Sequence, residues 1–335
     1  LYNIKWGNKM KKFFKRLGKA LGVILFELVY ILGLGIYLIY YTEFFTTTRD
    51  MIVTTSMTTM SHQYFATWFL SQEKIDEILA SNRITSNNQE QDLQKVDTTE
   101  SDGKDKGSTE GIEIVDVSTD TFKAYLMIID DPSRVDLVTA KDVGTVGSTT
   151  SQIVEDYGAI AGINAGGMAD DAAGNGGEPT GLLITNGEYY SDVNPYDYFS
   201  MCGFTQDNVL YVSDSINKAS IDQLNLRCAV SFGPVLIVNG EPRISGGGGW
   251  GIQPRTCIAQ RQDGTVLFLV IDGRQTDSVG ATLKNAQDIL LNYDAYNAFN
   301  LDGGASSTMV FDSKLVNKPS DILGERYVPT AFIVN

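Results

Sequence analysis

Hydrophobic and polar positions first set apart one long apolar stretch near the start of the chain. Residues 21–41 read LGVILFELVYILGLGIYLIYY, which carries one charge, Glu27. In a helix, 21 residues span about 30 Å, the thickness of the hydrocarbon core of a bilayer. The pattern therefore predicts a transmembrane anchor over 21–41. Glu27 lies close enough to the basic end of this segment to extend toward the headgroups.

The residues on either side of this stretch predict its orientation. Seven Lys and Arg residues lie within 1–20, and such an excess marks the cytoplasmic side of a membrane helix. Tyr37, Tyr40 and Tyr41 at the other end are typical of an aromatic belt at the membrane surface. A cleaved signal peptide is the alternative, but its apolar core is shorter and a cleavage site between small residues should follow. We therefore expect residues 1–20 in the cytoplasm and the body outside.

The next 69 residues divide into two segments of different amino-acid composition. In 42–82, apolar residues recur at helical spacing after Ser71, a residue type that caps helices, so we expect a juxtamembrane helical stalk. Residues 83–110 contain no aromatic residue and are rich in Gln, Asn, Asp, Ser, Thr and Lys. Such a segment buries too little apolar surface to order itself, which predicts a flexible linker.

Short strand-like runs and turn signals begin at residue 111. Three dipeptides between apolar runs mark hairpin turns: Asn186-Gly187, Asn239-Gly240 and Asp263-Gly264. Helices are predicted over 148–158, which ends in a glycine, and over 282–293, where apolar residues form one face. Many hairpins and few helices predict an α+β fold for 111–335. We expect a mixed or antiparallel, β-rich domain with a few flanking helices.

Charge narrows the possible functions. Residues 1–50 carry a net charge of +5, whereas the whole chain carries −15, so the rest carries −20. An acidic body repels nucleic-acid backbones, so we expect no nucleic-acid partner. The one histidine, His62, argues against His-based metal sites and Ser-His-Asp catalysis. A packed or surface position is the simpler interpretation of this histidine.

The cysteines are too few and too scattered for a disulfide framework. Cys202, Cys228 and Cys257 lie in apolar or strand-like runs, and no Cys-x-x-Cys pair is present. Buried structural thiols are the simpler interpretation. A disulfide between Cys228 and Cys257 is the alternative for an exported protein.

Glycine-rich polar loops interrupt the strand pattern and hold the candidate chemistry. Asp272 and Asp302 each follow an apolar run and precede a glycine. Glycine lets the backbone approach a ligand and leaves amide N–H groups open to an anion. Asp-Gly also marks ordinary turns. Two such aspartates with arginines nearby and an Asn-x-Gly-Gly loop favour a functional site over turns alone.

The same loops carry a resemblance to a known family. In chain order, the segments GINAGG, GNGGEPTGLLITNGE, PRTCIAQRQDGTVLFLVIDGRQ and FNLDGGASSTM resemble the phosphodiester glycosidase family over residues 111–335. Lysosomal members remove N-acetylglucosamine from phosphodiester-linked mannose, and bacterial members are often called exopolysaccharide biosynthesis proteins. The anchor, stalk and linker resemble membrane-bound members of Gram-positive bacteria. The usual Asn-Gly-Gly-Gly-Phe motif reads Asn164-Ala165-Gly166-Gly167-Met168 here, which bears on substrate detail more than on activity.

The resemblance implies cleavage of a sugar–phosphate ester at the anomeric carbon. The phosphate leaves as a stable anion, so it needs cationic or N–H partners more than a proton, and planar arginine suits it. Arg255 and Arg274 are the candidates for this role. The other face of the sugar needs a carboxylate, as nucleophile or as base for water. Asp302 and Asp272 are the candidates, with Glu178 third.

Smaller groups of the loops complete the expected site. Substrate contacts are expected from Asn164, Gly166, Gly167, Gly303, Gly304, Ser306, Ser307 and Thr308. The hydroxyls among them can equally bond the backbone, and a Ser307 nucleophile would have no second histidine to activate it. Asp170, Asp171 and Glu178 match no standard calcium loop. The metal requirement stays open, and no cofactor is expected.

These inferences predict a membrane-anchored, extracytoplasmic phosphodiester glycosidase acting on a cell-surface glycan or exopolysaccharide. One alternative is a non-catalytic glycan-binding or assembly factor for exopolysaccharide export, which would use the same cleft without turnover. Another is a transferase that passes the sugar to an acceptor other than water. Two carboxylates beside two arginines favour an enzyme over a binding protein, whereas the sequence does not separate a hydrolase from a transferase.

Overall fold

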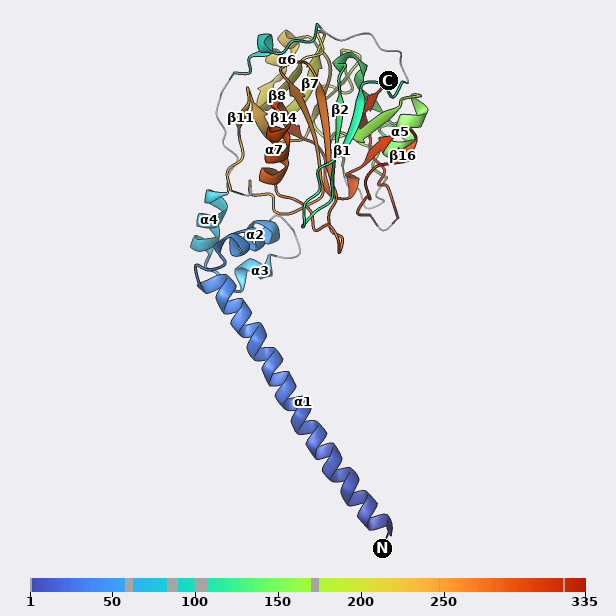
Figure 1. The fold of residues 1–335 in the computed structure, drawn as a ribbon. Coiled ribbons are helices and arrows are strands. Elements are labelled where there is room, and N and C mark those ends of the chain that lie inside the picture. The colour runs from blue at the N-terminus through green and yellow to red at the C-terminus, as the bar shows by residue number, and fades with distance from the viewer. Residues whose placement is uncertain are drawn as a thin grey trace. The chain divides into compact units, whose positions relative to one another are not determined.

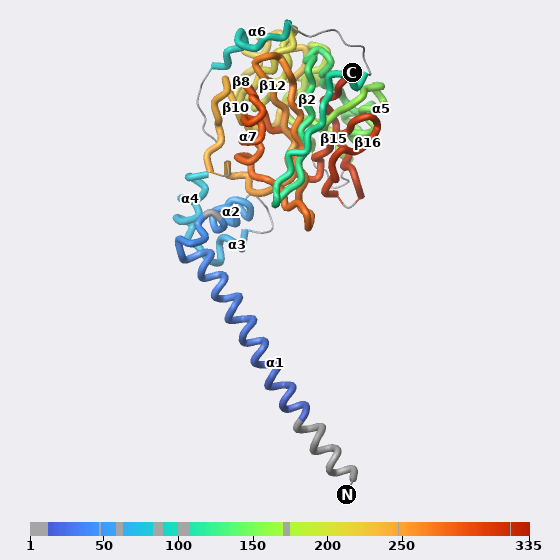
Figure 2. Tube along the Cα trace, viewed as in Figure 1, coloured from blue at the N-terminus to red at the C-terminus, as the bar shows by residue number. Residues whose placement is uncertain are grey.

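The chain forms two compact units, Leu1–Leu79 and Ala80–Asn335. Figures 1 and 2 show the first as helical and the second as built mainly of strands. The computed structural model describes residues 2–57, 63–82, 90–99, 108–169, 175–246, 248–321 and 323–335, without the side chains of 2–12 and 47. His62, Asp170 and Asp171 lie outside the described residues.

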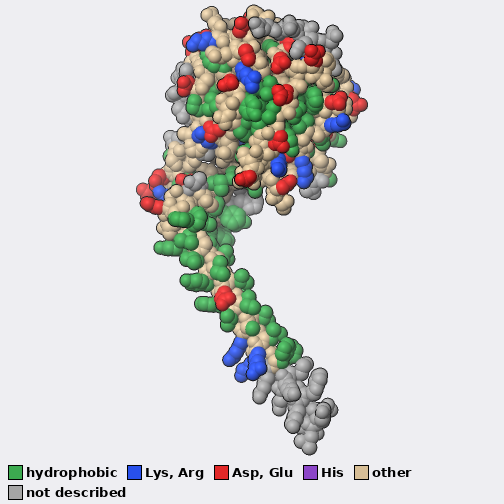
Figure 3. Space-filling view, in the orientation of Figure 1, with side chains coloured by type: hydrophobic (Ala, Val, Ile, Leu, Met, Phe, Trp, Pro, Cys, Tyr) green, Lys and Arg blue, Asp and Glu red, His purple; other side chains and the backbone are tan. Residues whose placement is uncertain are grey.

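The first unit begins with one long helix, α1 (Tyr2–Tyr41). Within it, Phe13–Tyr41 is long and apolar enough to cross a membrane, and it is the one such helix among the described residues. Hydrophobic side chains cover most of its surface (Figure 3). The helix ends at Tyr41, where the predicted apolar segment ends, but it begins well before residue 21.

Three shorter helices complete this unit, α2 (Thr46–Met57), α3 (Tyr64–Thr67) and α4 (Gln72–Ser81). Their small core contains the buried side chains of Val53, Ala66, Ile75 and Ile78. The hydroxyl of Ser71 accepts a hydrogen bond from the N–H of Lys74 at 3.3 Å. Ser71 therefore caps α4, as the sequence predicted.

The largest sheet of the second unit has seven strands. In spatial order they are β1 (Ile112–Asp116), β2 (Ala124–Ile129), β13 (Val266–Ile271), β12 (Arg255–Arg261), β14 (Ala295–Asn300), β10 (Val235–Val238) and β11 (Glu241–Pro242). Every neighbouring pair is antiparallel. The sheet thus brings the two ends of the chain segment 112–300 into one layer.

Two five-stranded sheets complete the β structure, and their ladders are also antiparallel. The second sheet runs β16 (Lys314–Leu315), β15 (Met309–Phe311), β4 (Ala161–Asn164), β17 (Thr330–Val334) and β3 (Val135–Thr139). The third runs β6 (Glu188–Tyr189), β5 (Leu183–Thr185), β9 (Leu226–Ser231), β7 (Tyr198–Thr205) and β8 (Leu210–Asn217).

One hydrophobic core joins the three sheets. Phe332 of β17 lies at its centre, with ring centroids 6.3 Å from Phe268 of β13 and 6.2 Å from Phe204 of β7. All three rings are fully buried. Because each aromatic ring comes from a different sheet, their contact fixes the sheets against one another.

Helices cover outer faces of the sheets (Figure 1). The helix α7 (Leu283–Asn292) packs on the large sheet, α5 (Thr150–Asp156) on the second and α6 (Lys218–Leu224) on the third. Three 3₁₀ turns are η1 (Leu93–Lys95), η2 (Pro132–Arg134) and η3 (Gly304–Ser306). The predicted helices over 148–158 and 282–293 are therefore present, each a little shorter than expected. The α+β fold class is confirmed.

Two of the predicted hairpin turns show the backbone that their sequence requires. Asn186 and Asn239 have φ angles of 53° and 54°, and each is followed by a glycine with φ of 78°. Consecutive residues with positive φ form the hairpin turn that Asn-Gly favours. The first turn joins β5 to β6 and the second joins β10 to β11.

Residues 90–99 pack against strands of the second unit, which corrects the prediction that all of 83–110 is a flexible linker. The side chain of Gln91 donates to the carbonyl of Leu210 at 2.6 Å and accepts from the N–H of Val212 at 2.8 Å, both on β8. Val96 is buried against Val209 and Tyr296. The polar composition misled the prediction because one valine and a few amide contacts suffice when an open sheet edge is available.

Candidate functional site

Three neighbouring strands of the large sheet place candidate residues at one end of the strands, which we call the arginine edge. Because β12 is antiparallel to β13 and β14, the beginning of β12 lies beside the ends of both neighbours. Arg255, the first residue of β12, pairs with the last residue of β13. On the other side, the N–H of Leu301 donates to the carbonyl of Thr256 at 2.8 Å. Asp272 and Asp302, each one step further on, therefore flank the beginning of β12.

Asn164 joins strand β4 of the second sheet to this edge. Its side-chain amide donates to the carbonyl of Asp302 at 2.6 Å. Its side-chain oxygen accepts from the hydroxyl of Thr256 at 2.8 Å and from the N–H of Thr308 at 3.1 Å. The side chain is fully buried, and these bonds use most of its hydrogen-bonding capacity. Asn164 thus holds the backbone on both sides of the 302–308 loop.

The glycines after Asp302 are required by close packing. A Cβ atom on Gly303 would lie 2.8 Å from the carbonyl oxygen of Pro254. Gly304 has a φ of 63°, and a Cβ there would lie 3.1 Å from a terminal nitrogen of Arg274. The N–H of Asp302 donates to the carbonyl of Ala165 at 2.9 Å. The Asp302-Gly303-Gly304 loop therefore lies directly against β12 and the Arg274 guanidinium, as the glycine pattern suggested.

Arg255 is a buried cation whose hydrogen-bond acceptors are backbone carbonyls. The side chain is 3% exposed, and its nitrogens donate to the carbonyls of Ala281, Trp250 and Gly251 at 2.7–3.2 Å. Among the described residues, no carboxylate forms an ion pair with it. Burial, with a smaller contribution from the charge of Arg274, lowers the pKa of Arg255 to about 10. A buried guanidinium without an acidic partner is an attractive site for an anion.

Arg274 presents a second guanidinium beside the same loop. Its backbone is left-handed, with φ of 58°. The side-chain oxygen of Gln253 accepts from Nε at 3.1 Å and from a terminal nitrogen at 2.6 Å, which fixes the plane of the guanidinium. Partial burial lowers the pKa of Arg274, as does the charge of Arg326. The structure thus brings the two arginines named from the sequence together, and it adds Gln253, which no motif marked.

Asp272 is the more enclosed of the two strand-end carboxylates, at 4% exposure, whereas Asp302 is half-buried. Oδ1 of Asp272 accepts a hydrogen bond from the side-chain amide of Asn317 at 2.8 Å. The N–H of Lys318 donates to both carboxylate oxygens of Asp272 at 3.1–3.2 Å. Burial raises the pKa of Asp272, and these hydrogen bonds oppose the rise. Asn317 was missed because nothing in the local sequence distinguishes it from a surface asparagine.

Two serine hydroxyls of the 302–308 loop are buried without a hydrogen-bond partner among the described residues. They belong to Ser306 and Ser307, each 1% exposed. The neighbouring Thr308 is equally buried, and its N–H donates to Asn164. Buried hydroxyls without a partner are costly. Ser306 and Ser307 lie four and five residues after Asp302 in the same loop.

The N–H groups of the Asn164-Ala165-Gly166-Gly167 segment all donate hydrogen bonds within the fold. The N–H of Gly166 donates to the Thr330 hydroxyl at 3.0 Å, and that of Gly167 donates to the carbonyl of Ser231 at 3.4 Å. The expectation that these amides point to a ligand is therefore wrong. A Cβ on Gly166 would lie 2.2 Å from Val230, and one on Gly167 would lie 3.2 Å from the ring of Phe232. Close packing explains both glycines.

An aromatic pair stands beside this segment and was not found from the sequence. Phe232 and Trp250 have ring centroids 6.0 Å apart at an interplanar angle of 71°. Phe232 adjoins Gly167, and the carbonyl of Trp250 accepts from Arg255. The pair therefore connects the Gly166-Gly167 segment to the buried arginine.

Glu178 lies apart from the two aspartates. It is exposed, and one of its carboxylate oxygens would lie 3.8 Å from a Cβ on Gly144. Its carbonyl accepts from the N–H of Ala169 at 2.9 Å. No contact among the described residues joins Glu178 to Asp272 or Asp302. No group of three or more potential metal-ligating side chains occurs in the described part of the chain.

The three cysteines are free and buried. Burial raises the pKa of each thiol, that of Cys257 to about 12. The disulfide considered between Cys228 and Cys257 is not formed. The simpler interpretation, buried structural thiols, agrees with their positions on β7, β9 and β12.

Comparisons with known sequences cover the same loops. A family model described as phosphodiester glycosidase matches residues 157–335. The SPbeta prophage-derived uncharacterized protein YomE of Bacillus subtilis (strain 168) is 30% identical over 182 residues, which cover 52% of this chain and 28% of YomE. The N-acetylglucosamine-1-phosphodiester alpha-N-acetylglucosaminidases of Bos taurus and Homo sapiens are each 40% identical over 70 residues, or 21% of this chain and 13% of theirs. The match thus spans less than a third of each relative.

Solved structures share the fold. The catalytic domain of zebrafish N-acetylglucosamine-1-phosphodiester alpha-N-acetylglucosaminidase, described as auto-inhibited by its pro-peptide, superimposes with a TM-score of 0.54 at 21% identity. That likeness covers 67% of this chain and 82% of the zebrafish chain. A hypothetical protein from Synechocystis reaches 0.50 at 16% identity, covering 67% and 61%. At these identities the likeness concerns the fold alone.

Proposed function

Because the chain belongs to the phosphodiester glycosidase family, we propose that it hydrolyses a sugar-1-phosphodiester at the edge formed by β12, β13 and β14. The observation that carries the proposal is the pair of arginines beside Asp302. Arg255 is buried without an acidic partner among the described residues, and Arg274 lies against Gly304. This arrangement supports a phosphate position next to a carboxylate.

The arginines bind the phosphate that leaves. Arg255 supplies positive charge in a site that excludes water, where electrostatic attraction is strong. Arg274 supplies a planar guanidinium whose orientation Gln253 fixes, which suits a two-pronged contact with phosphate oxygens. As the bond between the anomeric carbon and the phosphate oxygen breaks, both electrons stay with that oxygen. The arginines stabilise the added charge, so the leaving phosphate needs no protonation.

Asp302 is assigned the carboxylate role on the sugar. It either attacks the anomeric carbon, with water completing hydrolysis, or takes the proton of the attacking water. The protein donors that enclose the Asp272 carboxylate, from Asn317 and Lys318, favour a positioning role for that residue. Glu178 comes third because its described contacts place it next to Gly144 rather than beside the arginines.

The remaining loop groups are assigned to the sugar. The hydroxyls of Ser306 and Ser307 are buried without partners and can exchange hydrogen bonds with sugar hydroxyls or phosphate oxygens. Thr308 is equally buried in the same loop. The ring of Phe232 lies beside Gly167 and pairs with Trp250, and this aromatic pair suits packing against a sugar ring.

The apolar helix supports the proposal that this activity takes place at a membrane. In this proposal Phe13–Tyr41 anchors the protein, with the basic residues before it in the cytoplasm and the second unit outside the cell. The substrate is then a cell-surface glycan or exopolysaccharide whose sugars are joined through phosphodiesters. The curated relatives from Bos taurus and Homo sapiens are named for an N-acetylglucosamine-1-phosphodiester, which makes that sugar the first to test.

The direct test incubates the full chain in detergent micelles with methyl phosphodiesters of several sugar 1-phosphates. Proton NMR identifies the released sugar and its first anomer. Release of free sugar from at least one diester, together with methyl phosphate, supports the hydrolase. Appearance of the sugar only on an added alcohol acceptor would replace hydrolysis by transfer. Binding of all the diesters without release would leave a binding protein instead.

A further inference from the structure

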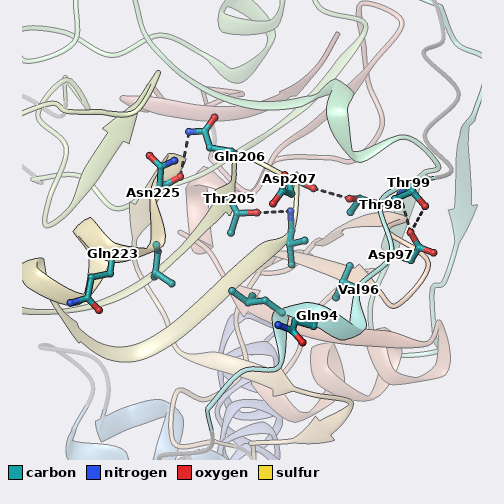
Figure 4. Close-up of a pocket in the computed structure, with 13 residues that line it drawn as sticks. Gln94, Val96, Asp97, Thr98, Thr99, Thr205, Gln206, Asp207, Gln223 and Asn225 are labelled. Carbon is teal, nitrogen blue, oxygen red and sulfur yellow. Dashed lines mark hydrogen bonds between the residues drawn. The ribbon is translucent and has the colours of Figure 1, made fainter.

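Neither Arg255 nor Arg274 lines a second concave site, whose walls come from three separate parts of the second unit (Figure 4). Residues 93–99 form one wall, residues 205–209 of the turn between β7 and β8 form the second, and residues 223–225 at the end of α6 form the third. The cavity has a volume of about 520 Å³, within the range of small-molecule sites. The wall 93–99 belongs to the segment that the sequence predicted to be a linker.

Two hydrogen bonds join the walls of the cavity. The Thr98 hydroxyl donates to the carbonyl of Asp207 at 2.8 Å, which joins the first wall to the second. The side chain of Gln206 donates to the carbonyl of Asn225 at 3.3 Å, which joins the second to the third (Figure 4). Bonds within the walls also engage the hydroxyls of Thr99 and Thr205 and the carboxylate of Asp97. The cavity is therefore preformed, and binding there does not require the walls to be assembled first.

The lining has the chemistry of a neutral polyhydroxy ligand. Four carboxamides, three hydroxyls, two carboxylates and four apolar side chains line the cavity: Gln94, Gln206, Gln223 and Asn225; Thr98, Thr99 and Thr205; Asp97 and Asp207; Leu93, Val96, Val209 and Leu224. None of them is Lys or Arg, so the cavity offers a phosphate no cation. This lining contrasts with the edge that holds Arg255 and Arg274.

Carboxamides suit sugar hydroxyls because each can donate and accept at once, as a hydroxyl does. The side chains of Gln94 and Gln223 form no hydrogen bond to any described residue, and they come from opposite walls. Leu93, Val96, Val209 and Leu224 offer apolar surface for the C–H face of a sugar ring. Unengaged amides beside an apolar floor are arranged to receive a molecule with both kinds of surface.

We propose that this cavity is a second, non-catalytic site that binds a neutral sugar unit of a glycan chain. It goes beyond the proposed hydrolysis, because it needs neither a phosphodiester nor turnover. A glycan held here and at the arginine edge would be anchored at two points, which raises the effective concentration of its cleavable bond. Because the lining has no aromatic ring, we expect a dissociation constant on the order of 1 mM for a short oligosaccharide.

The experiment measures saturation-transfer difference NMR on the full chain in micelles, with two neutral probes, the trisaccharide of N-acetylglucosamine and maltotriose. A variant carrying Gln94→Ala and Gln223→Ala removes one amide from each of two exposed walls. We expect saturation of at least one trisaccharide with the unaltered protein and at least a tenfold weaker affinity with the double variant. The matched control is Gln152→Ala, an exposed glutamine on α5, which should leave binding unchanged.

The outcomes separate this site from the catalytic one. Hydrolysis of a sugar-1-phosphodiester by the double variant at the rate of the unaltered protein, together with lost trisaccharide binding, supports two independent sites. Two results would overturn the proposal without bearing on the proposed hydrolysis. One is equal binding by the double variant, and the other is no binding of either trisaccharide at a concentration ten times the expected dissociation constant. Equal thermal unfolding temperatures of the three proteins would show that lost binding does not arise from misfolding.

Discussion

The side-chain amide of Asn317 donates to the carboxylate of Asp272 at 2.8 Å, and the same amide nitrogen donates to the carbonyl of Ser307 at 3.0 Å. The side-chain oxygen of Asn317 accepts from the N–H of Met309 at 2.7 Å. One buried asparagine thereby ties the end of β13 to the loop that carries the partnerless serine hydroxyls. The geometry of the carboxylate and of that loop depends on a residue outside both motifs.

Replacing this link should destabilise the fold. In Asn317→Ala, the Met309 N–H, the Ser307 carbonyl and the Asp272 carboxylate lose a buried partner. We expect the free energy of unfolding to fall by about 3 kcal/mol or more, since three buried groups lose a partner and each such group costs about 1–3 kcal/mol. Urea denaturation measures this change. Asn292→Ala, at an exposed position of α7, is the control and should change it by less than about 0.5 kcal/mol. Equal losses in the two variants would contradict the assigned role.

The raised pKa of Asp272 predicts a pH dependence of stability. A carboxyl whose pKa is higher in the folded state than its ordinary 3.8 is favoured by folding in its protonated form. Its stabilising contribution is complete below about pH 3.8 and is lost as the pH rises through the folded-state value. The unfolding free energy of the unaltered protein minus that of Asp272→Asn should therefore fall with rising pH in this window. A difference that rises instead would mean that the Asn317 and Lys318 donors outweigh burial.

The sequence identified the elements that depend on local signals. Asn186-Gly187 and Asn239-Gly240 adopt the positive φ angles of a hairpin turn, because those residue types accept this backbone at low cost. Ser71 caps its helix for an equally local reason. The convergence of Asp272 and Asp302 was inferred from their place at strand ends. Antiparallel pairing of β13 and β14 with β12 accounts for it.

What the sequence missed depends on tertiary contacts. Asn317 and Gln253 act through side chains that reach other segments, and no spacing rule marks such residues. The amides of Gly166 and Gly167 were assigned to a ligand because glycine in a loop often has that role. Here Thr330 and Ser231 accept their hydrogen bonds, and neighbouring side chains leave no room for a Cβ. The glycines are explained by packing that only the folded chain shows.

The carboxylate assigned to catalysis can be tested with a near-isosteric change. Asp302→Asn should fold normally and still bind substrate, but its turnover should fall by about 100-fold or more, the usual loss for a positioned acid–base or electrostatic group. Initial rates on the active sugar diester measure this loss. Asp312→Asn is the control, because Asp312 lies exposed at the turn between β15 and β16 with φ of 48°, where asparagine fits equally well. Near-normal turnover in Asp302→Asn would move the carboxylate role to Asp272.

The orientation of Arg274 predicts that charge alone is insufficient. Arg274→Lys keeps the charge but loses the two-pronged contact, so kcat/KM should fall roughly tenfold, or about 1.4 kcal/mol. Gln253→Ala keeps the arginine but removes the oxygen that orients it, and it should give a smaller loss in the same direction. Arg261→Lys, whose Nε donates to the carbonyl of Tyr293, is the control away from the loop. Unchanged kinetics in Arg274→Lys would remove this residue from the phosphate role.

The contacts of residues 90–99 predict which N-terminal boundary a stable fragment of the second unit needs. Gln91 pairs through its side chain with Leu210 and Val212 of β8, an edge strand of the third sheet, and Val96 covers Val209 and Tyr296. A fragment that starts at residue 111 loses these contacts and exposes the edge, which invites association through unpaired backbone groups.

We expect the fragment 80–335 to be monomeric and the fragment 111–335 to be less stable by about 3 kcal/mol or more. Burial of one valine contributes about 1.5–3 kcal/mol, and each hydrogen bond contributes about 1 kcal/mol. Urea denaturation and light scattering measure the two effects. Within 80–335, Val96→Ala should reproduce part of the loss, whereas Lys95→Ala next to it, an exposed side chain, should not. Equal stability of the two fragments would show that 90–99 contributes nothing to the fold and would restore the boundary predicted at residue 111.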